Sequence, residues 1–346
     1  MTVDKEYCMS SFLMFRTIAD ETKCFAEGFK PNIFRADFPK IPVADSSDLE
    51  KAIAEQMKEW TKDGKAALAL SGGVDSAILA KYMPEGSTAY TFQCIVPGIE
   101  VTNEVPQAKK YAEENHLHHE VIEIYWEDFE RYASILMKHK GAPIHSIEVQ
   151  IYKAALKAKA DGFERLIFGE SSDVNYGGLS GLMSKDWTFG EFAERYTYLM
   201  PYLVLKKPQM ILEPYRQYEN DGMIDAHEFC RTFFLEEGMG SYVNACQCAE
   251  IDIQTPYIHT KLSVPLDYDR VRTGENKYVV RELFIKLYPN WTIPTKTPMP
   301  RPMNEWMANW TGPTRPEFWP HCTDSLAGDQ KWMVWALERF LNMLEA

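Results

Sequence analysis

The sequence contains neither a membrane-length apolar run nor an excess of basic residues. No run approaches the roughly 18–20 apolar residues of a spanning helix, and the first residues lack the charged-then-apolar order of a secretory signal. The 37 Lys and Arg residues are outnumbered by 50 Asp and Glu residues, which gives a formal charge of -13. That surplus repels phosphates, so a protein that wraps DNA or tRNA is disfavoured. We expect a cytoplasmic protein that binds neither membrane nor nucleic acid.

Cysteine is scarce and scattered, with seven residues in a chain of 346. This pattern does not form a disulfide framework. The one close pair, Cys246 and Cys248, has no second pair and no histidine at zinc-finger spacing, so a zinc site is not expected. The run from His116 to Glu120 does not predict a metal site either, because neighbouring residues of a strand face opposite sides. A composition of 45% hydrophobic and 25% charged residues excludes a disordered or fibrous chain.

The sequence divides into three parts. Residues 1–45 predict an N-terminal arm or hairpin, with the apolar run 11–15 in an edge strand. Residues 46–302 predict the main domain, and residues 303–346 predict a tail, rich in tryptophan and proline, that packs onto it. The aromatic stretch 187–202 permits either an acceptor pocket or plain core, and core is favoured.

Within the main domain, short apolar segments alternate with helical patterns. The apolar run 66–70 predicts a strand that is buried on both faces. The expected strands are 66–70, 89–96, 121–126 and 166–168, and the expected helices are one after a capping box at 47–50, one from about 76, and those at 105–114, 127–139 and 147–160. This alternation predicts an α/β fold with a doubly wound parallel sheet. Its ligand site should lie at the carboxyl ends of the strands, where Ser71, Cys94 and Gly169 fall.

A glycine-rich turn stands between the first of these strands and the helix after it. It reads Leu70-Ser71-Gly72-Gly73-Val74-Asp75-Ser76. The two glycines allow a tight turn that brings backbone N–H groups against an anion, and the following helix adds its positive end. Asp75 is placed to hold Mg²⁺ against phosphates. The turn is not a Walker motif, because no Gly-Lys-Ser/Thr follows at the required spacing.

A second turn, rich in glycine and carboxylates, follows the strand at 166–168. The sequence there is Leu166-Ile167-Phe168-Gly169-Glu170-Ser171-Ser172-Asp173-Val174-Asn175-Tyr176-Gly177-Gly178. Together the two turns resemble the pyrophosphate loop and the Ser-Gly-Glu-Gly-Ser-Asp-Glu signature of the synthetase domain shared by asparagine and β-lactam synthetases. The resemblance spans roughly residues 49–302 and includes 255–259 and the helix from 275 to 281. It implies an adenine nucleotide alpha hydrolase-like fold with an added helical C-terminal part.

The resemblance also assigns roles to individual residues. Ser71, Gly72, Gly73, Val74, Asp75 and Ser76 are expected to bind the pyrophosphate, and Leu70, Cys94, Phe168 and Gly169 are expected to line the adenosine site. Asp75 and Asp173 are expected to share Mg²⁺, although either could instead cap a helix. Glu170 is expected to act on the attacking amine, directly or by orienting another base. Lys296 is expected to stabilise the developing charge unless it is a solvated loop lysine, and Lys277 is a second candidate.

These assignments imply a ligase that consumes ATP. It would adenylate a small-molecule carboxylate, release pyrophosphate, and transfer the acyl group to ammonia or an amine. Position 2 holds Thr2 where glutamine-hydrolysing relatives have a catalytic cysteine, and no room remains for a glutaminase domain, so a separate ammonia-supplying protein is one expected partner and a second copy of the chain is another. The alternatives are a PP-loop enzyme that thiolates a nucleotide or tRNA, and a non-catalytic ATP-binding scaffold. Because Val174 and Asn175 replace the family's acidic residue, aspartate is not assumed as the carboxylate.

Overall fold

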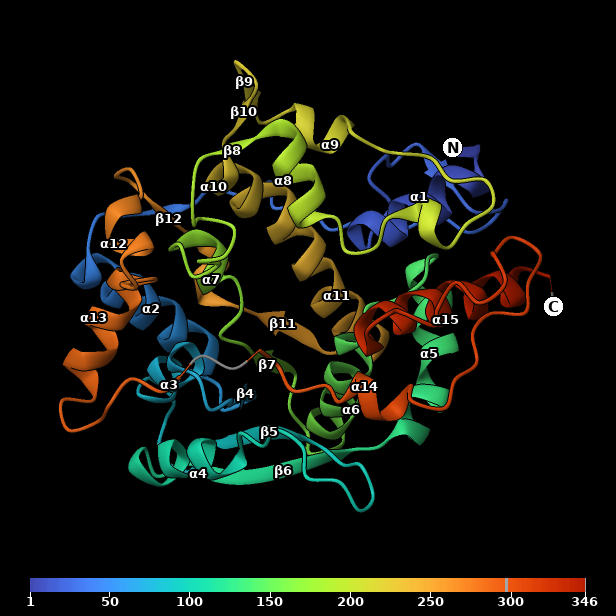
Figure 1. Cartoon of the computed structure of the whole chain (residues 1–346). Coiled ribbons are helices and arrows are strands. Elements are labelled where there is room, and N and C mark those ends of the chain that lie inside the picture. The colour runs from blue at the N-terminus through green and yellow to red at the C-terminus, as the bar shows by residue number, and fades with distance from the viewer. Residues whose placement is uncertain (296–297, 346) are drawn as a thin grey trace.

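A five-stranded parallel sheet, in the order β11-β7-β4-β5-β6, forms the centre of the molecule (Figure 1). The computed structural model describes residues 1–295 and 298–345. The chain adds β5 and β6 on one side of β4 and then adds β7 and β11 on its other side. The strands are β4 (Ala66–Ala69), β5 (Thr88–Cys94), β6 (His118–Ile124), β7 (Arg165–Ile167) and β11 (Asp252–Gln254). The predicted doubly wound parallel sheet is confirmed.

Helices cover both faces of this sheet. Side chains of β4 alternate between two cores, with Ala67 and Ala69 on one face and Ala66 and Leu68 on the other. All four are buried, as a short apolar run between two helical layers requires. The first face packs against α5 (Trp126–Lys140), α6 (Ile147–Ala160) and α11 (Leu235–Cys248). The second packs against α2 (Ser46–Thr61), α3 (Val74–Ala80), α4 (Val105–Glu114) and α13 (Tyr278–Leu287).

The helix boundaries follow the predicted ones closely, with two differences at the amino ends. Helix α3 begins at Val74, two residues before the predicted start. The predicted capping box at 47–50 is wrong, because Asp45 caps α2 instead. Its carboxylate accepts hydrogen bonds from the backbone N–H groups of Ser47 (2.8 Å) and Asp48 (3.0 Å). One carboxylate thereby satisfies two of the free N–H groups at the helix start.

The N-terminal segment departs from the prediction. The run 11–15, expected in an edge strand, belongs to helix α1 (Lys5–Phe15). Asp4 caps this helix by accepting from Tyr7 N–H at 3.0 Å, and every residue from Cys8 to Phe15 is buried. A helix that is covered on all sides shows no amphipathic period. The apolar run 11–15 is therefore interpreted as a strand from sequence alone. Helix α1 packs on α15 (Gly328–Leu344), and the proposed division at residues 45 and 302 stays a prediction.

The part beyond residue 180 is mostly helical, as expected. Its tail is fixed by aromatic packing, in which Trp332 stacks on Trp335 and Phe129 contacts Trp306 and Trp332. The other helices are α7 (Ser172–Asn175), α8 (Phe189–Tyr196), α9 (Glu213–Arg216), α10 (Ala226–Phe229), α12 (Tyr268–Arg272) and α14 (Met303–Trp306), with a π-helical turn at Cys230–Phe234 and 3₁₀ turns at Pro201–Leu203 and Pro256–His259. The remaining strands are β1 (Thr2–Val3), β2 (Lys23–Cys24), β3 (Ile41–Val43), β8 (Trp187–Thr188), β9 (Glu219–Asn220), β10 (Met223–Ile224) and β12 (Thr260–Leu262).

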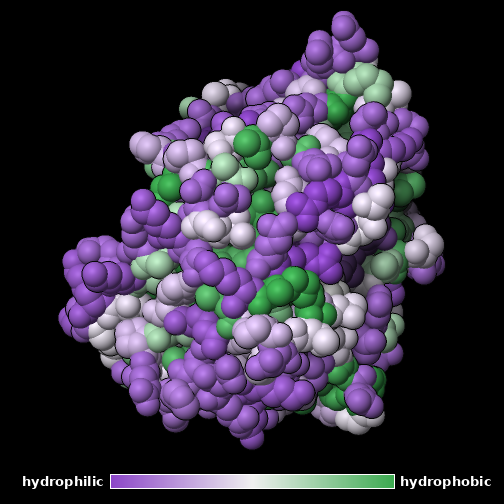
Figure 2. All heavy atoms as spheres, turned by 90° about the vertical axis from the view of Figure 1, so that its left-hand side faces the viewer, coloured by the Kyte–Doolittle hydropathy of each residue, from purple (hydrophilic) through white to green (hydrophobic). Residues whose placement is uncertain are grey.

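The surface that carries α2, α12 and α13 is mostly hydrophilic, with apolar side chains gathered in small patches (Figure 2). Within the described ranges 1–295 and 298–345, no helix combines the length and apolar character that crossing a bilayer requires.

Candidate active site

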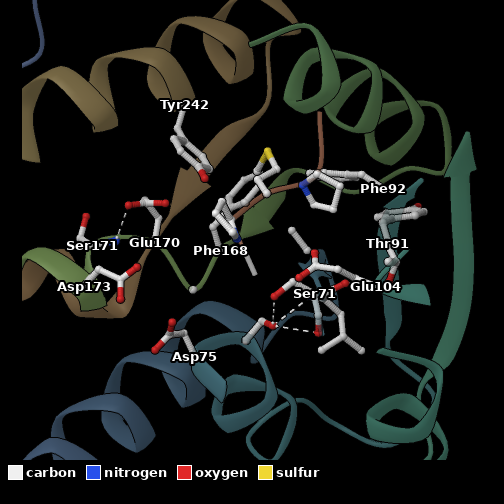
Figure 3. A pocket seen from close by; sticks show the side chains of 18 residues that line it. Ser71, Asp75, Thr91, Phe92, Glu104, Phe168, Glu170, Ser171, Asp173 and Tyr242 are labelled. Carbon is white, nitrogen blue, oxygen red and sulfur yellow. Dashed lines mark hydrogen bonds between the residues drawn. The ribbon is translucent and has the colours of Figure 1, made fainter. Parts of the chain in front are cut away.

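A cleft opens where β4 and β7 end side by side, at the point where the strand order of the sheet reverses. Leu68 of β4 pairs with Ile167 of β7, so the turns after the two strands face each other. Two adjoining cavities fill the cleft, and the first has a volume of about 180 Å³. Both are lined by Ser71, Asp75, Glu104 and Asp173, several of which Figure 3 shows converging on the same space. The cleft thus lies at the carboxyl ends of the strands, where the ligand site is predicted.

The first turn is held by hydrogen bonds among its own residues. The Ser76 hydroxyl accepts from Ser71 N–H at 2.9 Å and lies 2.9 Å from the Ser71 hydroxyl. The Ser71 hydroxyl accepts from Gly73 N–H at 3.2 Å. Tyr257, from the 3₁₀ turn in the segment that supported the resemblance, donates a hydrogen bond of 3.0 Å to the Asp75 carbonyl. These bonds fix the turn in one conformation.

The second turn lies directly against the first. A Cβ atom on Gly169 would stand 2.8 Å from the Ser76 nitrogen, which is too close for any side chain. At the far end of the same turn, a Cβ on Gly178 would stand 2.1 Å from Asp173 Oδ1 and 2.4 Å from Lys277 Cδ. Glycine is therefore required at both positions by close approach.

A buried lysine joins the carboxylates of the two turns. Lys277 Nζ lies 2.5 Å from Asp75 Oδ2 and 3.1 Å from Asp173 Oδ1. Burial alone would lower the pKa of Lys277, but the two carboxylates outweigh it and hold that pKa above its ordinary value. Gly73 and Ser171, not Asp75 or Asp173, stand at the cap positions of α3 and α7, so the alternative reading of these aspartates as helix caps is wrong.

Glu170 stands between the second turn and helix α11. Its carboxylate accepts a hydrogen bond from Ser171 N–H at 2.8 Å and another from the Tyr242 hydroxyl. Figure 3 shows this carboxylate facing Tyr242 above the turn. Burial is the largest influence on Glu170 and raises its pKa, although the two hydrogen bonds oppose that shift. A carboxyl group with a raised pKa accepts a proton more readily than an ordinary one.

Ser171 adopts a left-handed backbone conformation, with φ of 72°. This conformation costs a residue other than glycine about 1–2 kcal/mol, and the resembling family has glycine here. The Ser171 hydroxyl is buried and accepts or donates no hydrogen bond within the described ranges. Next to it, Val174 packs in the core and Asn175 donates a 2.7 Å hydrogen bond to the Tyr257 carbonyl. Val174 and Asn175 thus both make contacts within the fold, and the expectation that the acceptor differs from aspartate stays a prediction.

The structure brings together most of the residues predicted from sequence. The first cavity is lined by Leu70, Ser71, Asp75, Ser76, Phe168, Gly169, Glu170 and Asp173, and the second adds Gly73, Val74 and Lys277. Gly72 lines neither cavity. Cys94 does not line them either, because it is buried and its thiol donates to the Pro300 carbonyl at 3.2 Å. Lys296 lies outside the described residues.

Two residues of the cleft escaped sequence reasoning. Glu104 precedes α4 and lines both cavities, and burial raises its pKa to about 7. Its position after β5, at the same edge of the sheet, was a usable signal. Tyr242 comes from α11, 72 residues after Glu170, and packs edge-on against Phe168 with ring centroids 5.2 Å apart. No motif marks it, so only the fold could place it beside Glu170.

The donor set of the cleft suits one hard cation held jointly with phosphates. Asp75 Oδ1 is buried and has no hydrogen-bond partner in the part of the chain that the structure describes. Carboxylate oxygens of this kind are what Mg²⁺ prefers, and it commonly keeps only one or two of them alongside phosphate and water. Among residues 1–295 and 298–345, no group of three or more His, Cys, Asp or Glu side chains could hold a metal ion unaided. Asp75 and Asp173 thus fit Mg²⁺ when phosphate oxygens complete its shell.

The parallel sheet, the Ser-Gly-Gly-x-Asp-Ser turn and the cleft at its strand ends define an ATP-using enzyme of the PP-loop type. The sequence profile described as asparagine synthase matches residues 46–237, which is more than half of the chain. The chain belongs to the asparagine synthase family. A comparison with curated proteins gives no significant match.

Comparison with solved structures gives more distant similarities. An NH3-dependent NAD synthetase from Campylobacter jejuni is 16% identical, and the match covers 39% of this chain and 61% of that one with a TM-score of 0.26, so the chain spans less than two thirds of that neighbour. A predicted subunit of tRNA methyltransferase from Methanocaldococcus jannaschii is 14% identical, with 63% and 75% covered and a TM-score of 0.24. NMN synthetase from Francisella tularensis is 11% identical, with 74% and 99% covered and a TM-score of 0.28. At these scores the neighbours bear on no detail of the site.

Proposed function

We propose that this protein is an AMP-forming amide synthetase. It activates a small-molecule carboxylate with ATP and transfers the acyl group to ammonia or an amine. The observation that carries the proposal is the meeting of a phosphate-type turn, the cluster of Asp75, Asp173 and Lys277, and the carboxyl group of Glu170 in one cleft. Family membership supports the use of ATP, and the arrangement of these groups supports the two reaction steps.

In the first step, a substrate carboxylate oxygen attacks the α-phosphorus and pyrophosphate leaves. The turn from Ser71 to Ser76 binds the β- and γ-phosphates, and Leu70, Phe168 and Gly169 line the adenosine side of the cleft. Asp75 and Asp173 would hold Mg²⁺, which would supply neutralisation of phosphate charge and so favour departure of pyrophosphate. Lys277 fixes both carboxylates and supplies a positive charge beside the second cavity, where the pyrophosphate collects.

In the second step, the amine nitrogen attacks the acyl carbon, the bond from that carbon to the AMP oxygen breaks, and the amine loses a proton. Glu170 accepts this proton, because burial raises its pKa and makes it a better proton acceptor than an ordinary carboxylate. Tyr242 orients Glu170 through its hydrogen bond. We assign stabilisation of the developing charge to Lys296, which is supported by the neighbouring segments: Thr295 lines the second cavity and Pro298 lines the first.

The two alternative functions receive less support. Sulfur transfer needs a reactive thiol, whereas burial raises the pKa of Cys94 to about 12 and its hydrogen bond to Pro300 ties it down. A scaffold that merely binds ATP has no need of Glu170 and Tyr242 at the acceptor side of the cleft. A homodimer and a partner that supplies ammonia remain part of the proposal.

Pyrophosphate release tests the proposal. Purified protein is incubated with ATP, Mg²⁺ and a broad panel of carboxylates, each with ammonia, and pyrophosphate is measured by a coupled assay. We expect at least one carboxylate to stimulate release, and Asp75→Ala to abolish that stimulation. Asp37→Ala, at an exposed aspartate outside the cleft, is the matched control and should leave it unchanged. No stimulation by any carboxylate, together with tight ATP binding by calorimetry, would favour a scaffold.

A further inference from the structure

A second hollow lies beyond the acidic end of the cleft, where the segment after α7, the carboxyl end of α8 and the residue before α11 meet. We call it the α8 pocket. It has a volume of about 460 Å³, and its main walls are formed by Gly178, Leu179, Arg195, Tyr196, Tyr198 and Phe234. This size falls in the range of small-molecule sites, which is roughly 300–1,000 Å³. The proposed phosphate chemistry uses none of these side chains.

The α8 pocket begins where the acid and lysine cluster ends. Gly178 forms one wall, and its Cα faces Asp173 and Lys277 with no room for a side chain between them. Its N–H group also donates a 2.7 Å hydrogen bond to the Asp173 carbonyl. The α8 pocket and the cluster of Asp173 and Lys277 therefore lie on opposite sides of Gly178, separated by this one backbone position.

The walls of the α8 pocket are aromatic and fixed. Tyr196 meets Tyr198 and Phe234 with centroid distances of 5.4 and 5.8 Å. The buried Arg16 guanidinium covers the Tyr198 ring at 3.8 Å and donates to its hydroxyl, which holds the ring in place. Phe234 ends the π-helical turn at Cys230–Phe234, an irregularity that widens the helix locally and often marks a functional site. These features favour a flat, apolar occupant.

Among the described residues that line the pocket, Arg195 is the charged one. Its side chain is exposed, and no hydrogen bond or ion pair joins its guanidinium to another residue within 1–295 and 298–345. Its guanidinium lies at the pocket wall, close enough that a Cβ on Gly181 would stand 3.1 Å from it. A guanidinium attracts a carboxylate or another anion and repels an ammonium group. The pocket therefore suits an occupant that carries an anionic group, as a carboxylic acid substrate does, and disfavours a simple ammonium.

We propose that the α8 pocket binds the acyl substrate, and that this substrate is a carboxylic acid with a flat apolar body and a second anionic group, which pairs with Arg195. The inference rests on the proposed function, because it takes the reacting carboxylate to lie by Asp173. It assigns a specificity role to Arg195, Tyr198 and Phe234.

Binding in the absence of ATP tests the pocket separately from the reaction. Three probes are titrated by calorimetry and ligand-observed NMR: 4-carboxyphenylacetate, phenylacetate and succinate. We expect 4-carboxyphenylacetate to bind roughly tenfold more tightly than either of the others, since it alone offers both an aromatic body and a second anion. Equal binding of succinate, or no binding of any probe, overturns the proposal.

Two variants locate the binding. Arg195→Met should weaken 4-carboxyphenylacetate about tenfold and leave phenylacetate unchanged, whereas Arg131→Met, at an exposed arginine of α5, should change neither. Phe234→Ala should weaken both aromatic probes. An unchanged Kd for 4-carboxyphenylacetate in Arg195→Met contradicts the inference. If binding depends on Arg195 but no carboxylate stimulates pyrophosphate release, the pocket is supported and the proposed reaction is contradicted. If a carboxylate stimulates release but binding does not depend on Arg195, the reaction is supported and the pocket is contradicted.

Discussion

Two buried cations hold distant parts of the chain together in different ways. Arg16 lies in the core, where it joins α1 to α11, and Lys277 lies in the cleft, where it joins α13 to the two turns. Arg16 donates to Glu237 at 2.9 Å and lies 2.5 Å from His145 Nε2. Lys277 contacts Asp75 and Asp173. Each cation is enclosed, yet only one of them faces a cavity.

The difference lies in the charge that surrounds each cation. Burial, with a contribution from Arg16, lowers the pKa of His145 well below its ordinary value, so the core cluster pairs one guanidinium with one carboxylate. In the cleft, the Lys277 ammonium group lies between two carboxylates that both line the cavities. A neutral core pair is suited to fixing a fold, whereas carboxylates that line a cavity are suited to binding a ligand cation. The same kind of contact thus serves structure in the core and chemistry in the cleft.

The largest expected effect comes from breaking the core pair. Glu237→Gln leaves the Arg16 guanidinium buried without its carboxylate, so we expect the free energy of unfolding to fall by about 3–5 kcal/mol. Urea denaturation measures this loss. Glu236→Gln is the neighbouring control, because its partner Arg35 is exposed, and it should cost no more than about 1 kcal/mol. Similar losses in both variants would show that the core ion pair contributes no more to the free energy of unfolding than the exposed one.

Removing the cleft cation should affect activity more than stability. Lys277→Met is expected to lower carboxylate-dependent pyrophosphate release by roughly 100-fold, since a positioned charge near a developing anion is worth about 2.7 kcal/mol. Lys286→Met, on the exposed side of the same helix, is the control. If Lys277→Met instead unfolds the protein as Glu237→Gln does, the contrast between the two clusters is wrong.

The acid beside the first turn should make nucleotide affinity depend on pH. Glu104 is uncharged below its pKa of about 7 and becomes an anion above it, facing the space assigned to phosphates. We expect the Kd for ATP with Mg²⁺ to rise roughly fivefold as the pH is raised from 6 to 8, which corresponds to about 1 kcal/mol. Titrations of Glu104→Gln across the same range isolate the contribution of this residue. An identical rise in the variant would assign the pH dependence to the nucleotide itself.

The smallest expected effect is a gain. Ser171→Gly relieves the left-handed backbone beside the cleft, so the free energy of unfolding should increase by about 0.5–1 kcal/mol. Thermal unfolding should show a shift of about 2 °C upward. Ser172→Gly, at the adjacent helical position, provides the opposite sign, since glycine destabilises helices. A lower midpoint for Ser171→Gly would mean that its side chain contributes more than its backbone costs.

Sequence reasoning reached the cleft better than it reached the core. The turns at 70–76 and 168–178 are each formed by residues close in sequence, and glycine, serine and aspartate at fixed spacing predict their conformation. Helix α1 could not be predicted in this way, because it is buried on all sides and shows no period. Tyr242 and Arg16 depend on partners that only the folded chain provides. Cys94 lies at the end of its strand as predicted, but it does not line the cavities. Its thiol instead donates a hydrogen bond to the Pro300 carbonyl, a contact that only the folded chain provides.

The packing of α1 on α15 affects how the chain folds while it is being synthesised. Lys5 of α1 and Glu317, in the segment that precedes α15, form a 2.6 Å ion pair and are separated by 312 residues. A ribosome adds roughly 5–20 residues each second, so α1 waits many seconds with its apolar surface uncovered before its partner emerges. Contacts between such distant residues also slow folding. The same contact that secures the finished protein therefore makes the nascent chain a natural client for chaperones.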